Sequence, residues 1–181
     1  MFIIRIILVF SFLLPSFYCS NILDDLAPDG RDLRDGSSAN YPGKLGAIVP
    51  ATSFKYCDST NGQLSDFIPA KSGVVFYFTM WCSVCYAHTS HIVNTLKPAY
   101  PNVEFIVVDF VSGTVGSCSS SVSANGLTGK LPVVADTDLS LFDYFGGTMS
   151  KTVLVNAGGM VIFNEDFKDA SRLTDALNAL P

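Results

Sequence analysis

Two cysteines separated by two residues are the part of this sequence best suited to chemistry. Cys82 and Cys85 stand in the segment WCSVC, and Trp81 comes directly before them. Two histidines, His88 and His91, continue the same three-residue step. A close cysteine pair can exchange disulfides, bind a metal ion or form an inert crosslink. The strand and helix that position the pair help to decide among these three roles.

The pair follows a continuous apolar and aromatic run, GVVFYFTM at 73–80, which predicts a strand buried on both faces. We expect a helix from Cys82 to Leu96, ended by Pro98. Cys82 would then lie at a helix N-terminus, where free N–H groups and the helix dipole favour a thiolate. The thiolate is the nucleophile of disulfide exchange, and Cys85 follows one turn later, where it is placed to attack a mixed disulfide.

The rest of the chain from residue 45 alternates strand and helix patterns. In order, we expect a hairpin at 52–67, the strand at 73–80 and the helix after it, a second buried strand at 103–110, a weaker helix at 117–127, a short strand at 131–136, a short helix at 136–146, a hairpin at 151–165 and an amphipathic helix at 170–180. This order predicts an α/β fold with a central mixed β-sheet, largely parallel, flanked by helices on both faces and preceded by an N-terminal β-hairpin.

The N-terminal residues have a different composition. Residues 1–20 carry one positive charge followed by a short apolar run, which predicts a signal peptide or an N-terminal anchor. Cys19 is a candidate for lipidation, although Tyr18 before it is larger than that modification normally accepts. Residues 21–44 are rich in Asp, Gly, Ser and Pro and predict a polar tether. We therefore expect an extracytoplasmic protein, periplasmic or secreted, that meets a membrane only through this N-terminal segment, if it is uncleaved or lipidated.

The charge and the remaining cysteines narrow the function further. The net charge is −5 and no basic cluster exists, so we expect no nucleic-acid partner. Cleavage of the leader would leave Cys57, Cys82, Cys85 and Cys118, and four cysteines allow three pairings. Disulfides persist outside the cytoplasm. The sequence leaves open whether Cys57 and Cys118 are bridged, free or simply buried.

With these segments in place, the chain resembles the thioredoxin-like superfamily. The resemblance rests on GVVFYFTMWCSVC, VEFIVVDF, LPVVADTDLSLFDYFG and KTVLVNAGGMVIF, together with the segment AIVPATSFKYC before them. It looks nearest to the TlpA/ResA-type redoxins, which border the AhpC/TSA peroxiredoxins. The resemblance implies a thioredoxin fold over residues 45–181 and a disulfide-exchange reaction. We expect protein thiols or disulfides as substrates and an upstream redox partner that resets the cysteine pair. We expect no organic cofactor. The resemblance also implies that Cys82 attacks and that Cys85 resolves. From its place directly before the pair, we expect Trp81 to shield the two cysteines.

The sequence departs from this family at two places. Members usually carry a cis-proline at the start of the strand that faces the cysteines, where this chain has Ser150 after Met149. We expect Met149 and Ser150 to contact the substrate, with a backbone mode that the missing proline puts in doubt. TlpA/ResA-type proteins often have Glu three residues after the second cysteine, where this chain has His88. His88 is therefore either a proton-transfer group for Cys85 or an ordinary helix residue.

Three alternatives remain. A copper or zinc site could use Cys82, Cys85 and His88 with a ligand from the Ser150 loop, although His91 points too far around the helix to join them. A thiol peroxidase would pair Thr79 with Cys82, but it lacks a nearby arginine to stabilise the peroxide. A redox-inactive interaction module would keep only the fold. The sequence does not decide whether a redox pair here would act as a reductant or an oxidant.

Overall fold

The computed structural model describes residues 41–181 of the chain. The predicted signal peptide or anchor at 1–20, Cys19 and nearly all of the tether at 21–44 lie outside the described residues. Within 41–181, no helix is both long and apolar enough to cross a membrane.

A mixed five-stranded sheet forms the centre of the fold. Its strands lie in the order β5 (Val133–Ala135), β4 (Val103–Asp109), β3 (Gly73–Thr79), β6 (Lys151–Asn156) and β7 (Val161–Asp166). β3, β4 and β5 run parallel to one another, whereas β6 and β7 are antiparallel additions on the other side of β3. A separate hairpin of β1 (Ser53–Lys55) and β2 (Asn61–Gln63) precedes the sheet. The predicted mixed sheet with an N-terminal hairpin is confirmed.

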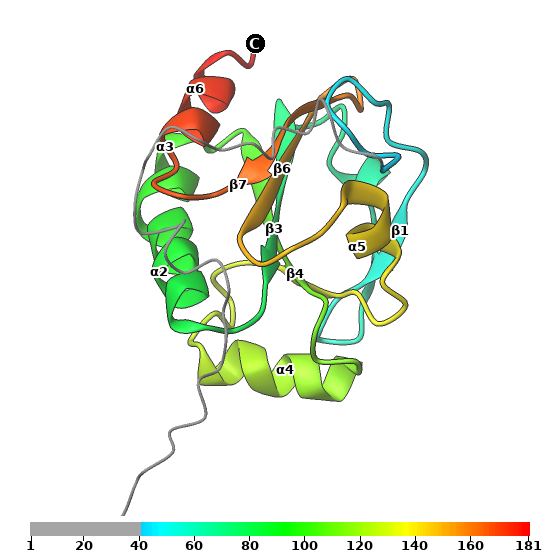
Figure 1. Ribbon diagram of the computed structural model, residues 1–181, viewed down its shortest axis with the longest axis vertical. Helices are drawn as coiled ribbons and strands as arrows, with labels where there is room; N and C mark the ends of the chain where they lie inside the picture. Colours follow the sequence, from blue (N-terminus) through cyan, green and yellow to red (C-terminus); the bar gives the residue numbers. More distant parts are fainter. Residues whose placement is uncertain (1–40) are drawn as a thin grey trace, which may run out of the picture.

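Helices cover both faces of this sheet, as Figure 1 shows. On one face lie α2 (Ser83–His91), the π-helical turn η2 (Ile92–Leu96), α3 (Lys97–Ala99) and α6 (Ser171–Asn178). α5 (Ser140–Phe145) and the β1–β2 hairpin lie on the other, and α4 (Val115–Ala124) stands at one end. A short 3-10 turn, η1 (Leu64–Asp66), replaces the end of the predicted hairpin.

β3 is the central strand, and every one of its residues is buried. Alternate side chains enter two separate cores: Val75 and Tyr77 face the core under α2 and α6, and Phe76 faces the core under α5. This two-sided burial explains why the strand reads as an unbroken apolar run rather than an alternating one. The cysteine pair therefore follows the end of a fully buried strand, which fixes its position.

The helix after the cysteines is longer than predicted. Helical structure runs from Ser83 to Ala99, so the prediction that Pro98 ends it is wrong. A proline in a helix lacks an N–H group and crowds the carbonyl four residues earlier. Here a π-helical turn precedes it, and the Lys97 N–H bonds to the Ile92 carbonyl five residues back. The wider turn accommodates the Pro98 ring, and the helix continues for one short segment.

A disulfide between Cys57 and Cys118 ties the segment after β1 to α4. The two Cα atoms lie 5.4 Å apart and both side chains are buried. This settles the pairing that the sequence left open, because Cys82 and Cys85 remain the free pair. The bridge closes a sequence separation of 61 residues that includes the whole strand–helix–strand unit around the cysteine pair.

Candidate functional site

The two free cysteines meet at the junction of β3 and α2. Cys82 is the N-cap residue of α2 and Cys85 lies in its first turn. Their sulfur atoms are 2.7 Å apart, and the Cys85 amide also donates to the Cys82 sulfur over 3.3 Å. Cys82 is half-buried, whereas Cys85 is only 1% exposed. The pair thus has one sulfur within reach of a partner and one held behind it.

The environment of Cys82 does not favour a thiolate as much as a helix N-terminus alone predicts. Burial and hydrogen bonding with the Cys85 thiol raise the pKa of Cys82 from 9.0 to about 11. Backbone N–H groups of the first turn lower the pKa of Cys82, as expected at a helix N-terminus, but this lowering is smaller than the increase due to burial. The net direction is therefore opposite to our expectation, because removal of the thiolate from water outweighs the dipole.

Trp81 takes a strained backbone conformation beside the pair. Its φ is +59°, a region that residues other than glycine rarely adopt. Its amide donates to the Thr79 hydroxyl over 3.1 Å, which fixes the turn between the strand and the helix. The indole is partly buried and packs on the core under α2. Its role as a shield for the cysteines stays a prediction.

The loop before β6 faces the cysteines, as the resemblance implied. The Met149 sulfur lies 3.5 Å from the Cys82 sulfur, although the two residues are 67 positions apart in the sequence. Met149 is partly exposed, so it borders the open side of the pair. A third sulfur atom is therefore part of the site, and the sequence pattern of the cysteines gave no sign of it.

Ser150 sits behind Met149 and is fully buried. Its amide donates to the Phe78 carbonyl over 3.1 Å, and its carbonyl accepts from the Phe167 amide and the Thr152 hydroxyl. Its φ is +65°. These contacts tie the loop to β3, to β6 and to the residue after β7, and they leave neither backbone group of Ser150 to a substrate. Of the two expected substrate-binding residues, only Met149 is open to a partner.

His88 lies on the buried face of α2 and not on its solvent-exposed face. It is 8% exposed, and its Nδ1 is 3.0 Å from the Tyr77 hydroxyl, the donor being set by the tautomer of His88. Its ring packs on Phe167 at 4.4 Å between centroids. Burial, and secondarily the charge of His91, lower the pKa of His88 from 6.5 to about 4. His88 is therefore a buried neutral imidazole at physiological pH.

Tyr77 is the site residue that the sequence analysis missed. Burial and the nearby Cys85 raise its pKa above the ordinary range, and the Ser150 hydroxyl acts in the opposite direction. Its hydroxyl therefore stays protonated; it lies 3.0 Å from Nδ1 of His88 and also interacts with Cys85. The only available signal was the alternation in VVFYFT, which puts residue 77 on the face of β3 that meets α2.

The structure weakens two of the alternatives. Among residues 41–181, no three His, Cys, Asp or Glu side chains gather as metal ligands, so the set with His88 is not assembled. The Thr79 hydroxyl accepts the Trp81 amide, and the hydrogen bonds of Cys82 go to Cys85 and Met149 instead of to Thr79. The one arginine of this segment, Arg172, pairs with Glu165 at 2.6 Å. The cationic donor that a thiol peroxidase needs is thus engaged elsewhere.

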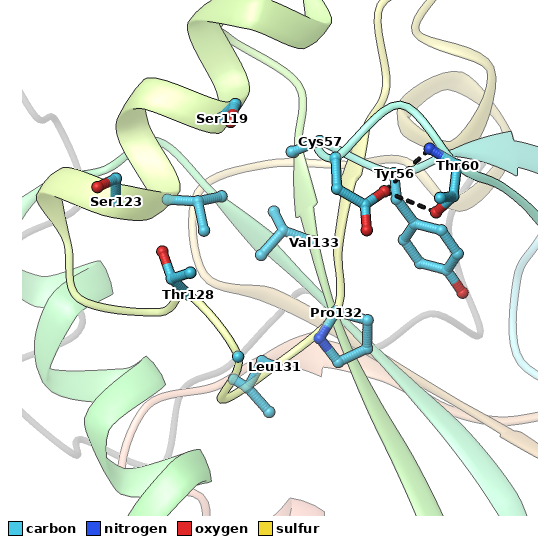
Figure 2. Close-up of a pocket in the computed structure, with 12 residues that line it drawn as sticks. Tyr56, Cys57, Thr60, Ser119, Ser123, Thr128, Leu131, Pro132 and Val133 are labelled. Carbon is cyan, nitrogen blue, oxygen red and sulfur yellow. Dashed lines mark hydrogen bonds between the residues drawn. The ribbon is translucent and has the colours of Figure 1, made fainter.

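A cavity of about 510 Å³ lies away from the cysteine pair (Figure 2). It opens between the turn after β1, α4 and the loop before β5, and its lining includes Tyr56, Cys57, Ser119, Thr128 and Val133. Neither Cys82, Cys85 nor Met149 reaches it. Cys57 on its wall belongs to the structural disulfide, so the cavity adds nothing to the chemistry of the free pair.

The fold is shared with many solved structures, although the sequence itself matches no protein-family model and no curated protein at a significant level. A secreted disulfide oxidoreductase from Mycobacterium tuberculosis has a TM-score of 0.57 and 21% identity, over 72% of this chain and 96% of that one. The peroxidoxin BcpB from the same organism has a TM-score of 0.59 and 16% identity, over 74% and 94% of the two chains.

A thioredoxin-like protein from Aeropyrum pernix has a TM-score of 0.59 and 15% identity, over 72% of this chain and 89% of that one. At these identities the likeness establishes the fold. The chain therefore has the thioredoxin fold that its sequence resemblance implied.

Proposed function

We propose that this protein is an exported thiol–disulfide oxidoreductase that exchanges disulfides with protein substrates through Cys82 and Cys85. One observation carries the proposal: a half-buried Cys82 sulfur lies 2.7 Å from a buried Cys85 sulfur at the start of α2. An inert crosslink needs no exposed member, whereas exchange needs one accessible nucleophile and one protected resolving thiol.

The reaction balances without a cofactor. The Cys82 thiolate attacks one sulfur of a substrate disulfide, a mixed disulfide forms and the other substrate sulfur leaves as a thiolate that takes up a proton. Cys85 then loses its proton and attacks the Cys82 sulfur, which releases the second substrate thiol and leaves the Cys82–Cys85 disulfide. The Tyr77 hydroxyl interacts with Cys85 and is proposed to donate to the thiolate formed in this second step.

Two features support the exported setting. The apolar segment at 1–20 has the pattern of a secretory leader. The buried Cys57–Cys118 disulfide suits an oxidising compartment, where such bonds persist. Met149 on the open side of Cys82 is proposed to contact the substrate, and an upstream partner is proposed to reset the pair.

The test uses single cysteine variants and a protein disulfide substrate such as insulin. Cys82→Ser should abolish its reduction, and Cys85→Ser should accumulate a mixed disulfide with the substrate that mass spectrometry detects. Reduction that survives in Cys82→Ser would refute the proposal. Peroxide consumption that depends on Cys82, without disulfide exchange, would instead favour the thiol peroxidase reading.

A further inference from the structure

Three sulfur atoms cluster at the mouth of the site, and this cluster is the starting point. The Cys82 sulfur lies 2.7 Å from that of Cys85 and 3.5 Å from that of Met149. The three come from two segments of the fold, the first turn of α2 and the loop before β6. Cys82 and Met149 are both partly open to solvent, so an ion has a path to the cluster.

We propose that the reduced protein binds one Cu(I) ion through Cys82, Cys85 and Met149. Thiolate and thioether sulfurs are soft ligands that select Cu(I) over harder cations. Three sulfurs placed about 2.3 Å from one metal ion would stand about 4 Å apart, taking the usual length of a metal–thiolate bond. The sulfurs therefore need to spread by about 0.5–1.3 Å from their positions here, which side-chain rotation at Met149 and Cys82 can supply.

The surroundings favour this ion over zinc. A structural zinc site takes four ligands in a tetrahedron, normally from Cys and His. His88, the α2 histidine considered as a ligand from the sequence, is buried in the core, with Nδ1 on the Tyr77 hydroxyl and its ring on Phe167. Because the described residues bring three sulfurs and no imidazole, the cluster suits the low coordination number of Cu(I) rather than a four-coordinate metal.

The loop that carries Met149 is held in place for this role. Ser150 locks it to β3 through the Phe78 carbonyl, at the position where the resemblance led us to expect a proline. Binding involves no electron transfer: copper stays Cu(I), and the Cys82 and Cys85 thiols release their protons to solvent. While the ion is bound, neither sulfur is free to attack a disulfide. Copper binding and disulfide exchange are therefore mutually exclusive.

The experiment titrates Cu(I) into the reduced full chain without oxygen, against the coloured chelator bicinchoninate. We expect one ion per chain, with X-ray absorption showing three sulfur neighbours. Met149→Leu keeps the apolar bulk and removes the sulfur, so it should weaken binding at least about tenfold and leave two sulfur neighbours. Met160→Leu removes an exposed methionine in the β6–β7 turn and should stay within about twofold of the parent.

The double variant Cys82→Ser/Cys85→Ser measures background binding, including any by reduced Cys57 and Cys118. The proposal is refuted if the parent binds no more copper than this variant, or if Met149→Leu binds as tightly as Met160→Leu. The proposed exchange reaction fails separately, since it is read from substrate reduction. A chain that reduces disulfides but takes up no copper overturns only the present inference.

Discussion

The hydroxyl of Tyr77 and Nδ1 of His88 lie 3.0 Å apart in the core between β3 and α2. The same hydroxyl interacts with Cys85, so one buried phenol links the inner cysteine to a buried imidazole. The sequence left His88 as either a proton-transfer group for Cys85 or an ordinary helix residue, and in the structure its Nδ1 contacts the Tyr77 hydroxyl.

Removal of the Tyr77 hydroxyl should slow the second step of exchange. Tyr77→Phe keeps the ring and its packing, but it takes a hydrogen-bond donor away from the Cys85 thiolate that attacks the mixed disulfide. A hydrogen bond to a charged group contributes about 1.5–3 kcal/mol, so release of the substrate should slow about tenfold or more. Rapid-quench mass spectrometry of the mixed disulfide measures this step, and an unchanged release rate would remove Tyr77 from the mechanism.

His88 should make the fold sensitive to acid. Its pKa is about 4 in the folded protein and 6.5 in the unfolded chain, so the unfolded state binds more protons between these values. Stability is therefore complete above pH 6.5 and falls as the pH drops towards 4. With allowance for residual solvent at the ring, we expect a loss of about 2 kcal/mol over this interval.

Urea unfolding at pH 7.0, 5.5 and 4.0 measures that loss. His88→Gln keeps a polar group near Tyr77 without a proton to gain in this range, so its stability should depend less on pH. His91→Gln should raise the pKa of His88, seen by NMR titration, because the charge of His91 contributes to the downward shift. A His88 resonance that titrates at 6.5 or above would contradict the burial argument.

The strands and helices could be predicted from the sequence because each depends on the residues within its own segment. The run at 73–80 is apolar throughout because both faces of β3 are buried, and Asp136 and Asp138 mark the start of α5 by accepting its first amides. The contacts of Met149 with Cys82 and of Tyr77 with His88 join residues of different elements, so the periodicity of a single helix or strand does not relate them. The resemblance placed the Met149 loop opposite the cysteines, but no residue pattern indicated its sulfur contact with Cys82 or the contact between Tyr77 and His88. The π-helical turn before Pro98 could not be predicted for a different reason: it depends on one shifted backbone hydrogen bond, from the Lys97 N–H to the Ile92 carbonyl.

The rate of attack by Cys82 should keep rising with pH well into the alkaline range. Burial and the neighbouring Cys85 thiol raise its pKa to about 11, so the thiolate fraction grows about tenfold per pH unit from 7 to 10. Iodoacetamide alkylation of the selectively reduced protein, followed by peptide mass spectrometry, reports this rate. Cys85→Ser removes one of the raising contacts and should bend the profile at lower pH. A plateau for the parent below pH 8 would show that the helix N-terminus prevails instead.

Loss of the Cys57–Cys118 bridge should lower stability without removing the free pair. The bridge spans 61 residues, and the loop-entropy relation gives about 4 kcal/mol for a loop of that length. Both sulfurs are buried, so Cys57→Ala/Cys118→Ala also leaves a small cavity. The expected result is a lower urea midpoint, while Cys82 still forms mixed disulfides at a temperature where the variant is folded. A midpoint equal to that of the parent would mean that the bridge constrains little of the unfolded chain.

The backbone at Ser150 allows a direct test of why no proline stands there. Ser150 has a φ of +65° and its amide donates to the Phe78 carbonyl, whereas proline requires a φ near −65° and has no N–H group. Ser150→Pro should therefore destabilise the protein by about 3 kcal/mol or more. Ser150→Gly and Ser150→Ala both lose the hydroxyl that interacts with Tyr77, so the difference between them isolates the backbone conformation.

Glycine adopts this φ without strain and alanine does not, so Ser150→Gly should be more stable than Ser150→Ala by about 1 kcal/mol. Urea denaturation of the three variants supplies the comparison. If Ser150→Pro is as stable as the parent, the loop has an alternative conformation with the proline geometry of the family, and Met149 would then leave its present place beside Cys82. The separation of the Met149 and Cys82 sulfurs thus depends on Ser150, one of the two positions at which the sequence departs from the pattern of the family it resembles.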